Sequence, residues 1–110
     1  MSRLKVPMHR SPKLRALAEG QTCVACGNCD GTVVWAHANL KEFGKAMGQK
    51  AHDWAGMFLC SVCHFQLDQG FLWTREEKRE RTHAWIAKTH AVIESLGLGA
   101  LIPNYARENI

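Results

Sequence analysis

The chain has 110 residues, of which 46% are hydrophobic and 22% charged, with a formal net charge of +4. This length allows one domain with a modest core, over residues 1–110, and excludes two independent domains. No apolar run approaches the roughly 20 residues that span a bilayer, and the basic start MSRLKVPMHRSPKLRAL lacks the apolar region of a secretory signal. We therefore expect a cytoplasmic protein with no membrane partner.

The chain begins with a basic arm, over residues 1–10, and a short helix. Five basic residues precede the first acid, Glu19: Arg3, Lys5, Arg10, Lys13 and Arg15. Phosphate neutralisation is a major source of nucleic-acid affinity, so these residues indicate nucleic-acid contact, with a solvated terminus as the alternative. Ser11-Pro12, the following KLRALAE and Gly20 predict a helix with a serine cap, proline in the first turn and glycine after its end.

The middle of the chain alternates turns, short strands and one short helix. The Cys- and Gly-rich residues 21–31 predict a metal-binding knuckle and a tight turn. The β-branched and aromatic residues 32–37 predict a strand, and residues 55–59 predict a second one. Between them, residues 38–53 predict a long loop with a short helical piece. Residues 61–69 then predict a short helix that ends at a glycine.

A long helix over about residues 74–96 is the most regular element. Thr74 and Glu77 form a capping box, and residues with helical spacing follow it: Trp85, Ile86, Thr89, Val92, Ile93 and Leu96. This stripe predicts packing on the core or on a second copy, so a homodimer through this helix is one option. His83 and His90 have no ligand partner nearby and are expected to be structural or exposed. LIPNYARENI is expected to form a tail.

Five cysteines form two groups with metal-ligand spacing. Cys60 and Cys63 make one C-x2-C pair, and Cys23, Cys26 and Cys29 contain two overlapping pairs. In a reducing compartment such pairs are more often metal ligands than disulfides, and an odd number excludes complete pairing. Four thiolates close the coordination shell of zinc. We therefore predict a structural Zn²⁺ held by four of the five, and which upstream cysteine is left out stays open.

The segment from Cys60 to His64, CSVCH, also matches the pattern for covalent haem attachment. That attachment normally takes place outside the cytoplasm, and the sequence has no export signal. The three upstream cysteines would then have no role. We therefore favour the zinc interpretation.

Three further side chains suggest a second, open metal site. His64 and Asp68 share one face of the predicted short helix, so together they can hold a catalytic metal and leave positions for water and phosphate. His37 ends the first predicted strand, where a neutral imidazole can take a proton from an attacking water. Each residue alone has a structural explanation. The cysteine knuckles would tie the strand of His37 to the helix of His64 and Asp68. This connection favours a catalytic role for the three residues over a structural one.

Three segments, W-A-H-A-N, G-K-A-M-G-Q-K-A-H-D and L-C-S-V-C-H-F-Q-L-D-Q-G, resemble in this order the HNH endonucleases, and most closely short prophage-encoded proteins assigned as nucleases. The resemblance implies an α+β fold with a zinc-stapled ββα-metal core (the His-Me finger) over about residues 21–70, flanked by the short N-terminal and long C-terminal helices. It also implies hydrolysis of DNA, with His37 as the general base. His64 and Asp68 would be ligands of a catalytic Mg²⁺, Mn²⁺, Ni²⁺ or Zn²⁺.

Two positions depart from the HNH pattern. Ala36 stands where many members carry a metal-binding Asp or His, and Ala55 stands where an Asn is expected, while Asp53 nearby can orient His37 or assist the metal. The candidate DNA-binding residues are Lys41, Lys45 and Lys50 in the central loop, with Arg10, Lys13 and Arg15. The departures leave one alternative open, a non-catalytic zinc-stapled DNA-binding or adaptor module.

The aromatic residues Trp54, Phe71 and Trp73 are expected to pack around the small core. Stacking on nucleic-acid bases is the alternative that we weighed for them. The three residues border the second predicted strand and the two downstream helices. Core packing is the favoured interpretation.

Overall fold

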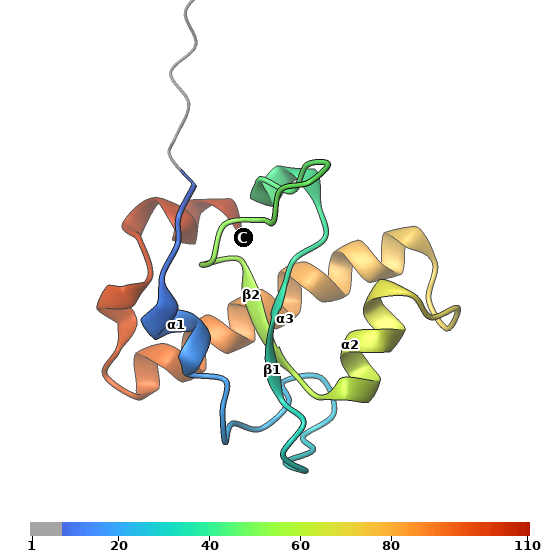
Figure 1. Cartoon of the computed structure of the whole chain (residues 1–110), viewed down its shortest axis with the longest axis horizontal. Helices are drawn as coiled ribbons and strands as arrows, with labels where there is room; N and C mark the ends of the chain where they lie inside the picture. Colours follow the sequence, from blue (N-terminus) through green and yellow to red (C-terminus); the bar gives the residue numbers. More distant parts are fainter. Residues whose placement is uncertain (1–7) are drawn as a thin grey trace, which may run out of the picture.

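The computed structural model of the protein describes residues 8–110, so Arg3, Lys5 and most of the predicted basic arm lie outside the described residues. The described chain forms a small α+β fold around a two-stranded sheet (Figure 1). Its elements in chain order are α1 (Pro12–Ala16), β1 (Val34–His37), η1 (Lys41–Phe43), β2 (Gly56–Leu59), α2 (Ser61–Asp68), α3 (Arg75–Ser95), η2 (Gly99–Leu101) and η3 (Asn104–Asn109).

The two strands pair antiparallel at the centre of the molecule. Val34 lies opposite Leu59, and His37 lies opposite Gly56. β2 is buried along its whole length, whereas in β1 only Ala36 is buried and Val34 is exposed. Trp35 lies across Gly56, and a Cβ atom at position 56 would come within 2.1 Å of the indole. A glycine at this position therefore allows the close contact between the strand and the tryptophan ring.

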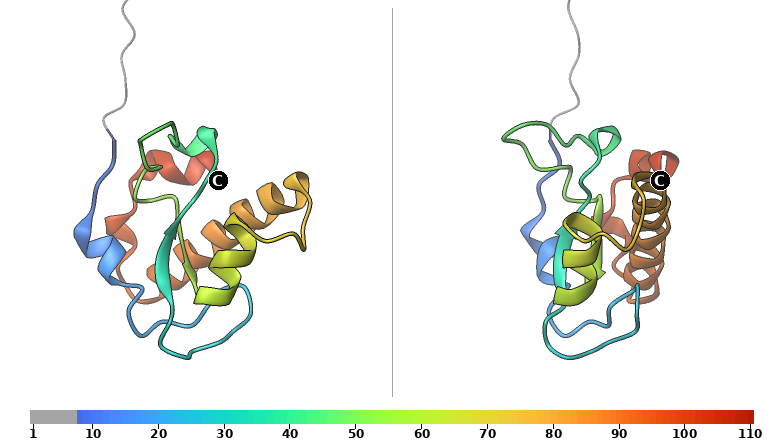
Figure 2. Two further views of the ribbon diagram at one scale, coloured as in Figure 1. Left: turned by 45° about the vertical axis from the view of Figure 1, so that its right-hand side comes forward. Right: turned by 90° about the vertical axis from the view of Figure 1, so that its right-hand side faces the viewer.

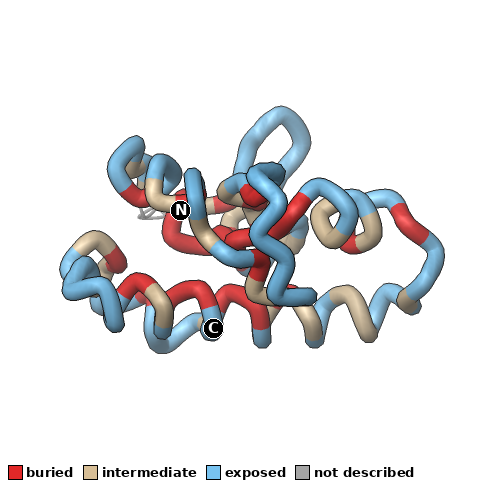
Figure 3. Tube along the Cα trace, turned by 90° about the horizontal axis from the view of Figure 1, so that it is seen from below, coloured by how far each residue is buried: buried red, intermediate tan, exposed pale blue. Residues whose placement is uncertain are grey.

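α3 forms a second layer behind the strands, as the side view in Figure 2 shows. Ile86, Thr89 and Ile93 are fully buried, and Figure 3 shows buried segments of α3 on the side of the strands. The Thr89 hydroxyl accepts a hydrogen bond from the Phe58 amide at 3.2 Å. The apolar stripe thus packs on the core of its own chain, although Leu96 is 49% exposed. A homodimer through α3 stays a prediction.

The local signals at helix starts are confirmed. The Ser11 hydroxyl accepts a hydrogen bond from the Leu14 amide at the start of α1. Thr74 and Glu77 exchange the two hydrogen bonds of a capping box at the start of α3. These bonds satisfy amide groups that the first helical turn leaves unpaired. No helix in residues 8–110 combines the length and apolarity needed to cross a membrane.

Two expectations for packing are wrong. Phe71 is fully exposed in the turn between α2 and α3, whereas Trp54 is buried and Trp73 packs edge-on against Trp85. The C-terminal LIPNYARENI segment forms 3₁₀ turns and buries two side chains, Ile102 and Ala106. This segment therefore packs on the hydrophobic core through Ile102 and Ala106 and is not a free tail.

The buried and exposed phenylalanines allow a matched test of the core. Phe58 is 0% exposed and Phe71 is 100% exposed. Phe58→Ala is expected to lower the free energy of unfolding by about 3–5 kcal/mol, because it leaves a cavity between β2 and α3. Phe71→Ala is expected to change it by less than about 0.5 kcal/mol. Denaturant titration of both variants measures the difference, and equal effects would contradict the fold.

Candidate metal centre and active site

Four of the five cysteines converge at the junction of β2 and α2. The Sγ atoms of Cys23, Cys26, Cys60 and Cys63 all lie within 4.8 Å of one another, and those of Cys26 and Cys60 are 3.7 Å apart. Zn–S bonds of about 2.3 Å in a tetrahedron separate neighbouring sulfurs by roughly 3.8 Å. The number, type and spacing of the donors therefore fit a structural Zn²⁺. Cys29 is exposed and lies outside the cluster.

Backbone hydrogen bonds hold the upstream knuckle in place. The Cys23 amide donates to Asn28 O, and the Gly27 amide donates back to Cys23 O, both at 2.9 Å. Gly27 has a φ of 79°, a value that favours glycine. The Val24 amide donates to Phe58 O at 2.9 Å. This bond attaches the knuckle to β2, so both cysteine pairs approach the same point.

The thiols influence one another because they are so close. Burial raises the pKa of the Cys63 thiol, and hydrogen bonds with the neighbouring thiols raise it further. Burial also acts to raise the pKa of Cys23, but hydrogen bonds from the Cys60, Cys26 and Ala25 backbone outweigh it and lower the pKa to about 7. One thiolate is thus stabilised, and further ionisation meets its negative charge. A divalent cation would remove this repulsion.

A cleft of about 460 Å³ brings together the three catalytic candidates. His37 enters it from β1, and His64 and Asp68 enter it from α2. Lys45 and Lys50 of the central loop line the same cleft. The side chains of His37, His64 and Asp68 are 18%, 36% and 32% exposed, respectively, so a ligand in the cleft can reach them.

His64 and Asp68 lie one turn apart on α2, and their Nε2 and Oδ2 atoms are 3.1 Å apart. Two neighbouring ligands at about 2.1 Å from a divalent metal are separated by roughly 3 Å, so this pair fits two positions of one ion. Within residues 8–110, the cysteine cluster alone offers three or more such ligands. The His64–Asp68 pair therefore supplies two donors and leaves the remaining positions to other ligands.

His37 is held by the buried carboxylate of Asp53. The His37 Nε2 atom lies 2.8 Å from Asp53 Oδ1. The Asp53 side chain is 1% exposed. Its Oδ2 atom accepts a hydrogen bond from the Ser11 amide at 2.6 Å and lies 3.1 Å from Arg15 Nε. Its Oδ1 atom lies 3.4 Å from the Arg10 guanidinium. These contacts occupy both carboxylate oxygens, and Asp53 is not among the residues that line the cleft.

The charge on Asp53 determines the form of the His37 ring. Burial raises the pKa of Asp53, but hydrogen bonds from His37 and Ser11 and the charge of Arg15 outweigh it and hold the pKa below its usual range. A carboxylate only accepts hydrogen bonds, so in the neutral ring of His37 the Nε2 atom carries the proton. Nδ1 makes no hydrogen bond within the described chain, and it is left as a proton acceptor.

The predicted DNA-binding residues divide into three groups. Lys45 and Lys50 line the cleft, and Lys41 lines a neighbouring one. Arg10 and Arg15 contact Asp53 instead, and Arg10 also donates to Ala51 O at 2.8 Å. Lys13 lies exposed on α1, away from both clefts. The sequence has no signal for the Arg10–Asp53 contact, because 43 positions separate the two residues.

Comparison with models of protein families matches residues 12–98 to the family described as "Putative nuclease YbcO". The chain belongs to the YbcO nuclease family. Membership in the YbcO family implies a hydrolase that acts on nucleic acids. The matched region contains the four clustered cysteines and the three catalytic candidates of the cleft. Comparisons with curated proteins and with solved structures find no match.

The exposed cysteines Cys26 and Cys29 provide a matched test of the metal centre. The purified protein is expected to carry about one tightly bound zinc per chain. Cys26→Ser removes one donor and should reduce the zinc content and lower the free energy of unfolding by more than about 3 kcal/mol. Cys29→Ser should keep both values. Elemental analysis and thermal unfolding measure them, and a loss of zinc in Cys29→Ser would contradict the assignment.

The contacts of Asp53 predict a dependence of stability on pH. Asp53→Asn is expected to lower the free energy of unfolding by about 1–3 kcal/mol near neutral pH, because it removes the buried carboxylate that accepts hydrogen bonds from Ser11 and His37, while Arg10 and Arg15 are exposed enough for water to solvate them. The pKa of Asp53 is lower in the folded state than in the unfolded state. Its stabilising contribution is therefore complete above the unfolded value, about 3.9, and is lost as the pH falls through the folded value.

The difference in free energy of unfolding between wild type and Asp53→Asn should consequently shrink below about pH 4. Denaturant titrations of both proteins at a series of pH values measure this difference, and the comparison cancels effects of pH on the cysteine cluster that the two share. A difference that stays constant with pH would show that Asp53 is not stabilised as a carboxylate.

Proposed function

We propose that the protein is a metal-dependent HNH-type endonuclease that hydrolyses phosphodiester bonds in DNA. The supporting observation is the convergence of His37, His64 and Asp68 in one cleft. β1, β2 and α2 are assigned to a ββα-metal core, because two antiparallel strands lead into a helix that follows a clustered cysteine directly. The resemblance to prophage-encoded nucleases makes a phage setting part of this proposal.

In this mechanism, His64 and Asp68 would hold a divalent metal ion, with Mg²⁺, Mn²⁺, Ni²⁺ and Zn²⁺ as candidates. When bound, the ion supplies positive charge that polarises the phosphate and stabilises the departing 3′ oxygen. Lys45 and Lys50 line the same cleft and would bind the non-bridging phosphate oxygens. They would thereby orient the phosphorus atom toward His37.

His37 would act as the general base. Its Nδ1 atom takes a proton from a water molecule as the water oxygen attacks phosphorus, and the bond from phosphorus to the 3′ oxygen breaks. The departing 3′ oxygen takes a proton from solvent. Asp53 keeps the Nε2 proton in place before the reaction and stabilises the imidazolium that forms. The hydrogen bond from His37 to Asp53 would thus both orient the His37 ring and stabilise its positive charge after proton transfer.

Plasmid cleavage provides the test. Wild type is expected to nick or cut supercoiled DNA with added Mg²⁺, Mn²⁺ or Ni²⁺. His37→Ala should reduce the rate by about 10²- to 10⁴-fold, because it removes the general base. His83→Ala is the matched control, since His83 pairs with Glu42 and lines neither cleft. Gel analysis of the nicked and linear products measures the rates.

The outcomes separate the enzyme from the alternative module. DNA binding without cleavage under any metal condition would support a non-catalytic zinc-stapled DNA-binding or adaptor protein. Equal rates for wild type and His37→Ala would remove His37 from the mechanism. The zinc content of each variant serves as a check on folding, because the cysteine cluster lies apart from the substituted side chains.

A further inference from the structure

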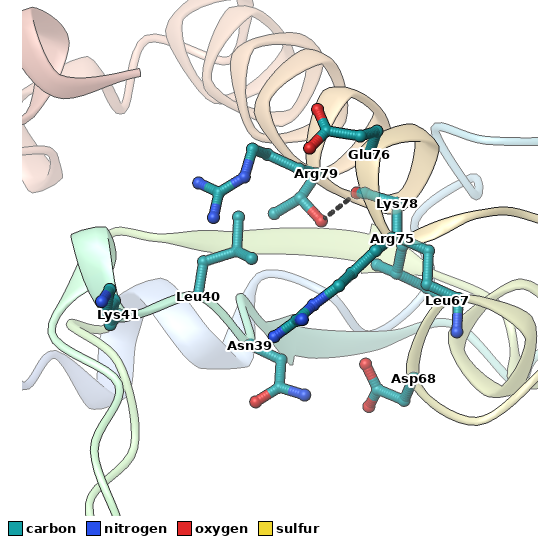
Figure 4. A pocket seen from close by; sticks show the side chains of 10 residues that line it. Asn39, Leu40, Lys41, Leu67, Asp68, Arg75, Glu76, Lys78 and Arg79 are labelled. Carbon is teal, nitrogen blue, oxygen red and sulfur yellow. Dashed lines mark hydrogen bonds between the residues drawn. The ribbon is translucent and has the colours of Figure 1, made fainter.

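A second cleft, of about 670 Å³, adjoins the candidate active site. Asn39 and Asp68 line both clefts, so the two are neighbours on one surface. The second cleft lies between α2, the first turns of α3 and the segment that follows β1 (Figure 4). Its lining includes four cationic side chains and two carboxylates: Lys41, Arg75, Lys78, Arg79, Asp68 and Glu76.

Two of the four cations have partners within the protein. The Lys78 Nζ atom donates to Gly70 O at 2.9 Å and thereby ties α3 to the end of α2. Arg79 pairs with Glu42. Hydrogen bonds from His83 and then Arg79 lower the pKa of Glu42 to about 2, so this carboxylate stays charged. Lys78 and Arg79 therefore have structural roles and are not the primary groups for a ligand.

The side chains of Arg75 and Lys41 make no hydrogen bond or ion pair in the part of the chain that the structure describes. Figure 4 shows Arg75 extending from the start of α3 toward Asn39, one of the two residues shared with the active-site cleft. An arginine side chain loses conformational entropy when it is ordered, and no hydrogen bond or ion pair within residues 8–110 offsets that loss for Arg75. Its position favours a ligand that crosses from one cleft into the other.

We propose that the second cleft binds the substrate backbone beside the phosphodiester that is cut, and that Arg75 contacts the adjacent phosphate. This inference rests on the proposed function. The planar guanidinium matches two phosphate oxygens, and the Asn39 amide lies at the boundary between the clefts. The half-buried side chain of Leu40 provides apolar surface for the sugar. A phosphodiester chain has the length and repeated charge to occupy both clefts, which an isolated anion lacks.

The substrate strand would pass over Asp68. On one side, Lys45 and Lys50 meet the phosphate that reacts, and on the other side Arg75 meets its neighbour. Asp68 and Glu76 repel phosphate wherever no cation intervenes, so contact through Arg75 also fixes the register of the strand. Arg75 is therefore assigned as a substrate-binding residue that positions the scissile bond, and it takes no part in proton transfer.

Binding is measured first, without cleavage. A fluorescent duplex oligonucleotide is titrated with His37→Ala protein that carries Arg75→Gln or, as the matched control, Lys88→Gln. Lys88 is exposed on the same helix and lines neither cleft. Arg75→Gln should weaken binding about tenfold at low salt and lower the slope of log affinity against log salt by about one. Lys88→Gln should leave both values unchanged.

Cleavage kinetics in the protein with native His37 form the second arm. Arg75→Gln should raise KM by about tenfold and leave kcat unchanged, as expected for lost binding outside the reacting groups. The effect should disappear with a substrate that keeps the scissile phosphodiester but ends one nucleoside beyond it on the side that the second cleft binds, so that the adjacent phosphate is absent. Arg75→Gln that matches Lys88→Gln in binding and KM would overturn the inference. So would a lower kcat with unchanged binding, or no DNA binding at all.

The two arms separate this inference from the proposed function. If the native protein binds DNA but does not cleave it, the endonuclease proposal fails, whereas the salt slope of Arg75→Gln still decides the role of the second cleft. If the protein cleaves DNA and Arg75→Gln behaves as wild type, the second cleft has no role and the endonuclease proposal stands. Zinc content confirms that each variant is folded.

Discussion

Four thiols within 4.8 Å of one another cannot all ionise unless a cation shares their site. The cluster joins two parts of the chain that are far apart in sequence, because one cysteine pair precedes β1 and the other follows β2 directly. Cys60 is also the residue from which α2 begins. The cluster therefore determines where α2 starts and which direction its His64–Asp68 face takes. A small sheet of two strands needs such a tie, since its own apolar surface is limited.

The carboxylate of Asp53 provides a second connection. It is almost fully buried, and it joins the segment before α1 to the His37 side chain at the end of β1. A buried charge is tolerated only when donors and opposite charges surround it. Arg10, Arg15 and the Ser11 amide provide them from one short segment. Arg10 and Arg15 thus have a structural role, which their positive charge alone does not reveal.

Local features were predictable because their causes lie within a few residues. The capping box of α3, the serine cap of α1 and the glycine after α2 each depend on neighbours one turn away, and all are present. The strand positions were also predictable, although β1 and β2 are each shorter than the predicted ranges. Packing was less predictable. Phe71 faces solvent while Ile102 and Ala106 of the expected tail are buried, because the shape of the whole chain decides which apolar surface is covered.

The sequence by itself determined the metal-ligand spacing and the three candidates His37, His64 and Asp68, and its resemblance to a known family indicated the α+β class. Spacing and residue type carry that information, since ligands one turn or one knuckle apart are close in any fold that contains the element. Only the tertiary structure excluded Cys29 from the cluster, paired Asp53 with Arg10 and Arg15, and placed Arg75 and Asp68 on the wall of one cleft. Those contacts join residues far apart in the chain, and no local pattern encodes such a distance.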